Sequence, residues 1–375
     1  MLRSLICALA LVAGVSHAGD SGVTPTEIRI GTTAVLSGPL GPQTQEYGDG
    51  ARLYFDAVNA AGGVHGRKIV YTALDDGFEV KRAVENSRKL ISEGKAFILF
   101  NNTGTAQTAA ILPLLQETQT VLFGPVTGAS EFRERFNRLV FHVRASYANE
   151  AQRIVSQLRQ TGITRVAVFY QDDPFGKALL EELRNASKAQ DLPFLGEVKV
   201  DPKKPDFAAA AAETAKLQPQ AVLMGTAGAT FPNFVKAMHA AGSKPSFYGY
   251  SVASLDAITQ GLKESARGIV LAQIMPSVRN SAVPVVAEYL KLMREQASEA
   301  APSPSQLEGF VHAKLLVEGL KRAGRNLTTE SFIQAMEAAG EISFGRFVAK
   351  YSPGSHNGSS YVELAIIDGQ GQLRY

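Results

Sequence analysis

The stretch EIRIGTTAVLSGPLGPQTQEYGDGARLYFDAVNAAGG, residues 27–63, decides the fold. Its first six residues alternate polar and apolar side chains, which predicts a strand. Residues 47–61 then place apolar side chains among good helix formers, and two glycines follow, which predicts a helix and its end. The fold therefore begins with a strand and a helix.

This strand–helix unit recurs along most of the chain. Further strands are predicted at 68–75, 97–100, 121–123, 166–170, 194–200 and 221–224. Further helices are predicted at 79–93, 105–117, 150–160, 175–190, 207–217, 230–241 and 307–322. Such alternation predicts α/β architecture, with parallel sheets covered by helices on both faces. Because the pattern restarts after the strand-like segment 140–144, we expect two doubly wound lobes with a ligand-sized crevice at the hinge between them.

The first eighteen residues have the features of a secretory signal peptide. Arg3 precedes an apolar run from residue 5 to residue 15, and small residues follow up to Ala18, where we expect cleavage. The alternative, an N-terminal helix of the mature fold, is disfavoured because no polar face interrupts the run. Cys7, the only cysteine, would leave with the signal, so the mature chain would contain no disulfide and no thiolate metal ligand.

Charge and motifs argue against nucleic-acid binding and catalysis. The net charge of +3, or +2 without Arg3, is too even for a nucleic-acid or anionic membrane partner. No two of the six histidines have metal-ligand spacing, and the sequence has no phosphate loop and no nucleophile elbow. Asp75-Asp76 and Asp172-Asp173 follow strands directly, where capping a helix is a simpler role than acid–base catalysis. We therefore expect a binding protein and not an enzyme, with no metal and no cofactor.

Three loops that follow predicted strands of the first lobe mix glycine with hydroxyl residues: 37–39, 101–105 and 124–130. In parallel sheets the strand ends meet at one edge, where helix N-termini offer free N–H groups and a positive dipole end. Each loop alone is also compatible with an ordinary turn or helix cap. Because all three lie on one edge, they predict a site for an anionic group.

Several motifs together carry a family resemblance. They are Ser37-Gly38-Pro39, Gly50-Ala51, NAAGGVHGR at 59–67, Asp75-Asp76, Gly124-Pro125, DDPFG at 172–176 and MHAAG at 238–242. On these residues the chain resembles the leucine/isoleucine/valine-binding-protein family, the type I periplasmic solute-binding components of ABC importers. The resemblance covers nearly the whole mature chain.

The resemblance implies two lobes joined by a three-segment hinge. The crossings are expected near Arg144, Met275 and Gly340. Lobe 1 would then comprise residues 24–143 and 277–339, and lobe 2 would comprise residues 144–276 and 340–375.

The resemblance also implies a ligand site. The site residues are expected to be Thr103, Gly104, Thr105, Val126, Thr127, Gly128, Arg144, Tyr147, Phe175 and Ser251. The hydroxyl of Thr103 and the adjacent N–H groups would hold a carboxylate, a role that charge-assisted bonds at a helix N-terminus support physically. Phe175 would form a wall against the ligand, whereas Tyr47, Tyr170 and Tyr250 are more readily explained by packing within a lobe.

Two departures from the family pattern bear on the ligand. Relatives that bind α-amino acids usually carry a hydroxyl at the position of Gly128 and an acid at that of Ser251, and these groups hold the ammonium. An unpaired buried ammonium is costly, so a small organic acid, aromatic ones included, is as strong a candidate as an amino acid unless Asp172 or Asp173 replaces the missing acid. Arg144 has two interpretations, a cleft residue that contacts the ligand or a hinge salt bridge.

Taken together, these expectations describe a monomeric periplasmic protein that delivers a small carboxylate-bearing ligand to the permease of an ABC importer. The alternative is a sensor subunit that presents its bound state to a membrane receptor. Nothing within the chain separates these two functions, whereas the neighbouring genes would.

Overall fold

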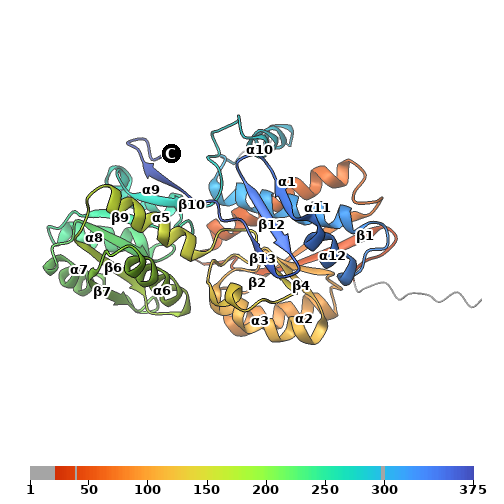
Figure 1. The fold of residues 1–375 in the computed structure, drawn as a ribbon, viewed down its shortest axis with the longest axis horizontal. Coiled ribbons are helices and arrows are strands. Elements are labelled where there is room, and N and C mark those ends of the chain that lie inside the picture. Colours follow the sequence, from red (N-terminus) through yellow and green to blue (C-terminus); the bar gives the residue numbers. More distant parts are fainter. Residues whose placement is uncertain (1–21, 39, 297–299) are drawn as a thin grey trace, which may run out of the picture.

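The protein consists of two α/β lobes that lie side by side, as the computed structural model shows (Figure 1). The structure describes residues 22–38, 40–296 and 300–375. The expected signal peptide, with Cys7, lies outside the described residues.

The first lobe is built on a five-stranded parallel sheet with the strand order β2-β1-β3-β4-β5. Its strands are β1 (Glu27–Ala34), β2 (Lys68–Asp75), β3 (Ile98–Phe100), β4 (Val121–Phe123) and β5 (Val140–Phe141). Its helices are α1 (Gly41–Ala60), α2 (Val80–Ser92), α3 (Thr105–Thr118), α4 (Glu131–Glu134), α10 (Pro284–Glu295), α11 (Pro304–Ala323) and α12 (Thr329–Ala339). Helix α1 begins six residues before its predicted start, because its first turn is polar and carries a proline, which suits an N-terminus but lacks apolar periodicity.

The second lobe is built on a seven-stranded sheet with the order β15-β14-β10-β9-β8-β6-β7. Its strands are β6 (Val166–Gln171), β7 (Phe194–Val200), β8 (Ala221–Gly225), β9 (Ser246–Gly249), β10 (Val270–Gln273), β14 (Glu363–Ile367) and β15 (Leu373–Arg374). Its helices are α5 (Tyr147–Gln160), α6 (Pro174–Ala189), α7 (Phe207–Lys216), α8 (Thr230–Ala240) and α9 (Leu255–Leu262), and a 3-10 turn η1 (Lys263–Ala266) follows. The strands from β6 to β10 are parallel, whereas β14 runs antiparallel to β10.

A small antiparallel sheet corrects the expected third crossing. It consists of β11 (Glu341–Ser343), β12 (Val348–Ser352) and β13 (Ser355–Gly358). Its apolar residues Phe347 and Tyr351 belong to the first-lobe core, and the His356 ring stacks on Phe141 of β5 with centroids 3.7 Å apart. The chain therefore passes to the second sheet after β13, and the crossing expected near Gly340 was placed too early.

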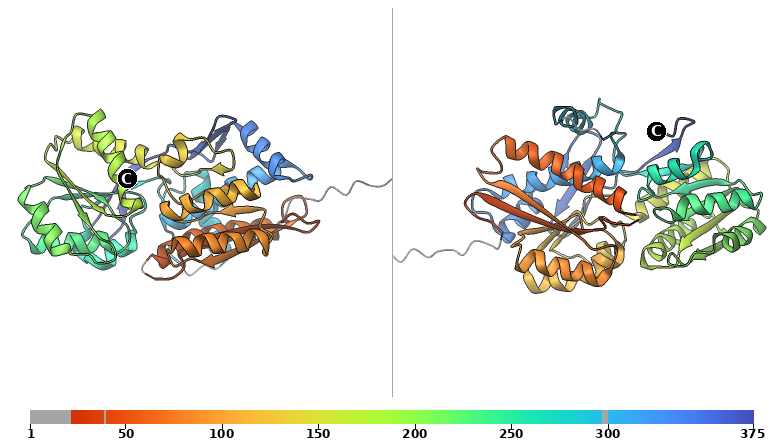
Figure 2. Two further views of the ribbon diagram at one scale, coloured as in Figure 1. Left: turned by 90° about the horizontal axis from the view of Figure 1, so that it is seen from below. Right: turned by 180° about the vertical axis from the view of Figure 1, so that it is seen from behind.

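Segments distant in sequence close the first lobe. Helices α1 and α11 cross in direct contact because each carries a glycine at the crossing: a Cβ atom on Gly50 would collide with the Gln306 carbonyl, and one on Gly309 with the Tyr47 carbonyl. Two further views show α11 and α12, from the C-terminal part of the chain, in the same lobe as β1 (Figure 2).

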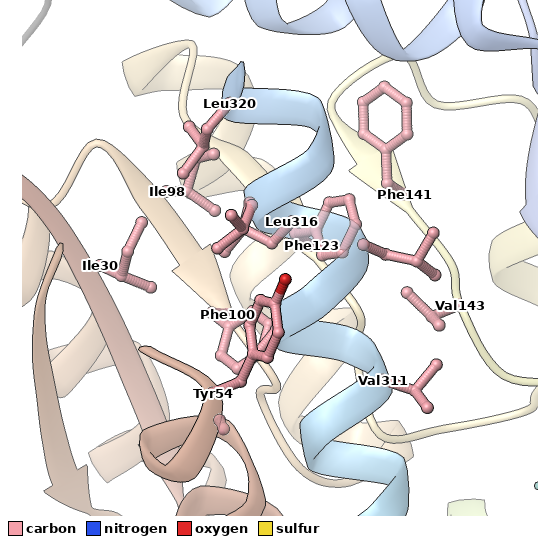
Figure 3. Packing of buried hydrophobic residues seen from close by; sticks show 14 of the residues in the cluster. Ile30, Tyr54, Ile98, Phe100, Phe123, Phe141, Val143, Val311, Leu316 and Leu320 are labelled. Atoms are coloured by element: carbon pink, nitrogen blue, oxygen red, sulfur yellow. The ribbon is translucent and has the colours of Figure 1, made fainter. Parts of the chain in front are cut away.

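The core of the first lobe contains a row of aromatic side chains along the sheet. Phe100, Phe123 and Phe141 stand on neighbouring strands, and adjacent rings in this row stack with centroids 6.5 and 6.1 Å apart. Leu316 and Val311 of α11 belong to the same cluster (Figure 3). This packing supports β3 and β4, whose carboxyl ends carry the predicted site loops.

Candidate functional site

A cavity of about 60 Å³ lies where the two lobes meet. Its first-lobe wall consists of Leu40, Gln43, Thr44, Tyr47, Phe78, Thr103, Gly104 and Val126. Its second-lobe wall consists of Tyr147, Phe175, Ala227 and Val252. Thus Thr103, Gly104, Val126, Tyr147 and Phe175 of the expected site residues lie on its lining.

The polar part of this lining is the loop between β3 and α3. Thr103 forms a parallel bridge with Val126, so the two strand-end loops are held together. Gly104 is the N-cap of α3 with φ +104°, and a Cβ atom there would collide with the Gln107 amide. Because no side chain caps α3, its first N–H groups remain available to an oxygen acceptor.

Three further expected site residues lie behind this lining and not on it. Thr105 and Thr127 are buried, and their hydroxyl oxygens lie 2.9 Å apart in a mutual hydrogen bond. A Cβ atom on Gly128 would lie 2.6 Å from Cδ1 of Tyr147, so no hydroxyl side chain fits at this position. These residues shape the loop that carries Val126.

Arg144 and Ser251 also lie outside the lining, in a buried ionic network at the first crossing between the lobes. Arg144 is fully buried; its Nη1 lies 3.6 Å from Oε1 of Glu308 on α11, and its Nη2 donates to Ser251 Oγ over 2.6 Å. Ser251 in turn donates to Glu150 of α5, from Oγ over 3.0 Å and from its backbone N–H over 2.7 Å. Of the two interpretations of Arg144, a cleft residue or a hinge salt bridge, these contacts correspond to the hinge salt bridge.

Burial governs the ionisation of this network. Loss of hydration raises the pKa of Glu150 to about 7, although Arg144 and the Ser251 donors oppose the shift. Desolvation likewise raises the pKa of Glu308, again against the attraction of Arg144. The acid beside Ser251 was not anticipated from the sequence, because Glu150 comes from a helix remote from it along the chain.

The paired aspartates do not reach the cavity lining. Asp172 forms ion pairs of 2.8 Å with both Lys177 and Lys199 near the surface, and these partners lower its pKa to about 2. Asp173 caps α6 by accepting from the Gly176 N–H over 2.8 Å. The capping role expected for such pairs is thus observed at Asp173.

The aromatic part of the cavity lining contains Phe78, which the sequence analysis missed, and Tyr47, which it had assigned to packing within a lobe. Phe175 and Tyr147 meet edge to face at 6.1 Å from the second lobe. Phe78 faces them from the first lobe. Its backbone has a positive φ of 65°. The Phe78 N–H donates to the Asp76 carboxylate, and the Gln107 side-chain amide donates to the Phe78 carbonyl. The signal was present, because Phe78 follows the β2 strand end at the same sheet edge. Tyr170 and Tyr250 are not on the lining, and the Tyr250 hydroxyl bonds to the Leu179 carbonyl.

Two negative findings hold for the described part of the chain. No cluster of three or more His, Cys, Asp or Glu side chains there is suited to a metal ion. None of the helices described is both long enough and apolar enough to cross a membrane.

Comparison with known proteins identifies the family. The model of the family described as periplasmic binding protein matches residues 27–371. The chain belongs to this family. Curated relatives of this periplasmic binding protein are described as Leu/Ile/Val-binding proteins or their homologues. One is the Leu/Ile/Val-binding protein homolog 7 of Brucella melitensis biotype 1, which is 23% identical over 91% of this chain and 87% of its own.

Two solved structures resemble this periplasmic binding protein over their whole length. A substrate-binding periplasmic protein from Ralstonia solanacearum is 30% identical, with 92% of this chain and 99% of that chain covered and a TM-score of 0.82. An extracellular ligand-binding receptor from Verminephrobacter eiseniae is 28% identical, with coverage of 93% and 100% and a TM-score of 0.86. The expected fold class, two lobes of type I architecture, is confirmed.

Proposed function

We propose that this protein binds a small carboxylate-bearing solute between its lobes in the periplasm and delivers it to the permease of an ABC importer, acting as a monomer. The observation that carries the proposal is the inter-lobe cavity with the Thr103–Gly104 loop on its lining. A carboxylate there would accept bonds from the Thr103 hydroxyl and from the free N–H groups of α3. The match to a binding-protein family supports the same function.

Among carboxylate ligands, the cavity favours organic acids over amino acids. Within the described residues its lining contains no Asp or Glu side chain that would pair with an ammonium group. Glu150, which lies beside Ser251, already accepts two hydrogen bonds from that residue and is influenced electrostatically by Arg144. Burying an ammonium without a partner is unfavourable by several kcal/mol, so the same site would bind zwitterions weakly.

The test is calorimetric titration of the mature chain with short aliphatic and aromatic acids and with leucine and valine. We expect the acids to bind more tightly. Thr103→Val removes a donor to a charged group and should weaken acid binding by about tenfold or more. Thr72→Val, which alters an exposed threonine on β2, is the matched control.

Two results would count against the proposal. Tight leucine or valine binding without any response to acids would reverse the ligand preference. Acid binding that is unaffected by Thr103→Val would remove the proposed carboxylate site.

A further inference from the structure

The side chain of Phe78 is an apolar ring that the fold leaves uncovered at the inter-lobe cavity. It is 36% exposed, whereas Phe100 and Phe123 in the core of the same lobe are fully buried. It belongs to the lining of the cavity, as does Phe175 of the second lobe. Uncovered apolar surface in such a cavity is available to an apolar part of a ligand.

The backbone holds this ring in place at a conformational cost. Phe78 has φ +65°, a region that a bulky side chain rarely adopts. Its N–H donates to Oδ1 of the buried Asp76 over 2.9 Å, and Gln107 Nε2 of α3 donates to its carbonyl over 2.8 Å. The Thr33 hydroxyl donates to the other oxygen of Asp76 over 3.0 Å. A glycine at this position would be free of the strain, so what the residue adds is its ring.

The Phe78 ring lies directly beside the proposed carboxylate position. A Cβ atom placed on Gly104 would be 3.0 Å from Cε2 of Phe78, so the edge of the ring lies against the N-cap of α3. The bond from Gln107 of α3 to the Phe78 carbonyl holds the helix and the ring together. A carboxylate that accepts from the first N–H groups of α3 therefore brings the rest of its molecule next to this ring.

The second lobe presents an anchored aromatic group to the same cavity. Phe175 packs edge to face on Tyr147 with centroids 6.1 Å apart, and Tyr147 packs in the same way on Tyr250 at 5.6 Å. The Tyr250 hydroxyl donates to the Leu179 carbonyl, which fixes this series of rings within the lobe. Because Phe78 and Phe175 belong to different lobes, the gap between them depends on the angle between the lobes.

The size and the chemistry of the cavity favour a flat group between these rings. The cavity has a volume of about 60 Å³, so a thin group requires the least separation of the lobes. An aromatic ring is thin, and its negative faces and positive edge complement the rings on either side. Leu40 and Val252 add aliphatic surface to the lining.

We propose that Phe78 is a specificity-determining residue and that the ligand is an aromatic carboxylate, whose ring lies between Phe78 of the first lobe and Phe175 of the second. The inference rests on the proposed function, since the carboxylate is placed at Thr103 and Gly104. The loop before α3 then recognises the charge of the ligand, and the two rings recognise its flat shape.

Calorimetry with benzoate, cyclohexanecarboxylate and hexanoate tests this assignment. Benzoate and cyclohexanecarboxylate have the same charge and the same number of carbon atoms, but only benzoate is flat and aromatic. The wild-type protein should bind benzoate about three- to tenfold more tightly than cyclohexanecarboxylate, the value of aromatic pairing beyond burial. Phe78→Leu keeps an apolar side chain without the ring, and should lower this ratio by about threefold or more.

Three further variants separate the ring from other effects. Phe78→Tyr keeps an aromatic ring and should retain the preference for benzoate. Phe78→Met is a second variant without the ring; neither leucine nor methionine is β-branched, so neither adds strain at the positive φ. Phe136→Leu removes a ring that is 46% exposed and is not on the cavity lining, and should leave the ratio unchanged. Thermal unfolding checks that each variant is folded.

The failures are distinguishable. If cyclohexanecarboxylate or hexanoate binds the wild-type protein at least as tightly as benzoate, or if the preference for benzoate survives in both Phe78→Leu and Phe78→Met, Phe78 does not select the ligand and only this inference is overturned. If no acid binds the wild-type protein, the proposed function fails and this inference fails with it.

Discussion

The two walls of the inter-lobe cavity present different chemical groups to a ligand. The first-lobe wall carries the Thr103–Gly104 loop at the start of α3, beside the rings of Tyr47 and Phe78. The second-lobe wall presents side chains, chiefly the rings of Tyr147 and Phe175. Backbone donors at a helix N-terminus are oriented before a ligand arrives, whereas rings on the opposite lobe contribute fully only when the lobes approach. From this difference we infer that the first lobe orients the ligand and that the second lobe encloses it.

The largest effect is expected from removing Arg144 from the ionic network that joins the lobes. Arg144→Met leaves Glu308 and Glu150 buried without their cation, and should lower the free energy of unfolding by about 3–5 kcal/mol. Urea denaturation measures the loss. The double variant Arg144→Met/Glu308→Met should be less damaged than the single one, because one of the orphaned charges is removed with its partner.

An exposed ion pair provides the control for Arg144. Arg138→Met removes the surface contact with Glu330 and should cost about 1 kcal/mol or less. Equal losses in the two variants would show that the buried network does not stabilise the junction of the lobes.

A smaller effect is expected from a substitution at Gly104, which tests the role of the first-lobe wall in ligand binding. Gly104→Ala combines a positive φ with a collision at Gln107, and should destabilise the protein by about 1–3 kcal/mol while weakening acid binding. Gly162→Ala has a positive φ but open space around it, so it reports backbone strain alone. Thermal unfolding and calorimetry of both variants check the prediction. Unchanged acid affinity in Gly104→Ala would separate this wall from ligand orientation.

The last prediction concerns the slope of stability with pH and the second lobe. The pKa of Glu150 is raised from 4.5 to about 7, so its contribution to stability is fully present below pH 4.5 and is lost as the pH rises through 7. Glu150→Gln should remove this part of the slope, which cannot exceed about 1.4 kcal/mol per pH unit. Urea denaturation between pH 5 and pH 8 measures it.

His312 contributes with the opposite sign, and it is present in both proteins. Its pKa is lowered from 6.5 to about 3, so its stability is present above pH 6.5 and is lost as the pH falls. The difference between wild type and Glu150→Gln therefore isolates Glu150. Identical pH profiles would contradict the assignment of a raised pKa to Glu150.

The sequence predicted well whatever depends on local periodicity. The strands at 121–123 and 194–200 have the predicted bounds, and the strand-end rule placed Thr103 and Val126 at the edge where the cavity lies. The same rule applied to β2 would also have found Phe78.

What the sequence left open depends on contacts between distant segments. Arg144 was ambiguous because its partners Glu308 and Ser251 come from other elements, and no spacing reveals that they meet. The sheet from β11 to β13 was missed for a related reason. Its short strands are stabilised by packing on β5, so their own patterns carry little information.

Because the chain crosses to the second sheet only after β13, the order in which its segments are synthesised affects how it folds. β14 pairs with β10, and α11 packs on α1, so neither lobe is encoded by one uninterrupted segment. During synthesis both lobes remain unfinished until the final strands emerge. A fragment that ends before residue 363 would leave β10 as an open edge, ready to pair with a neighbouring chain.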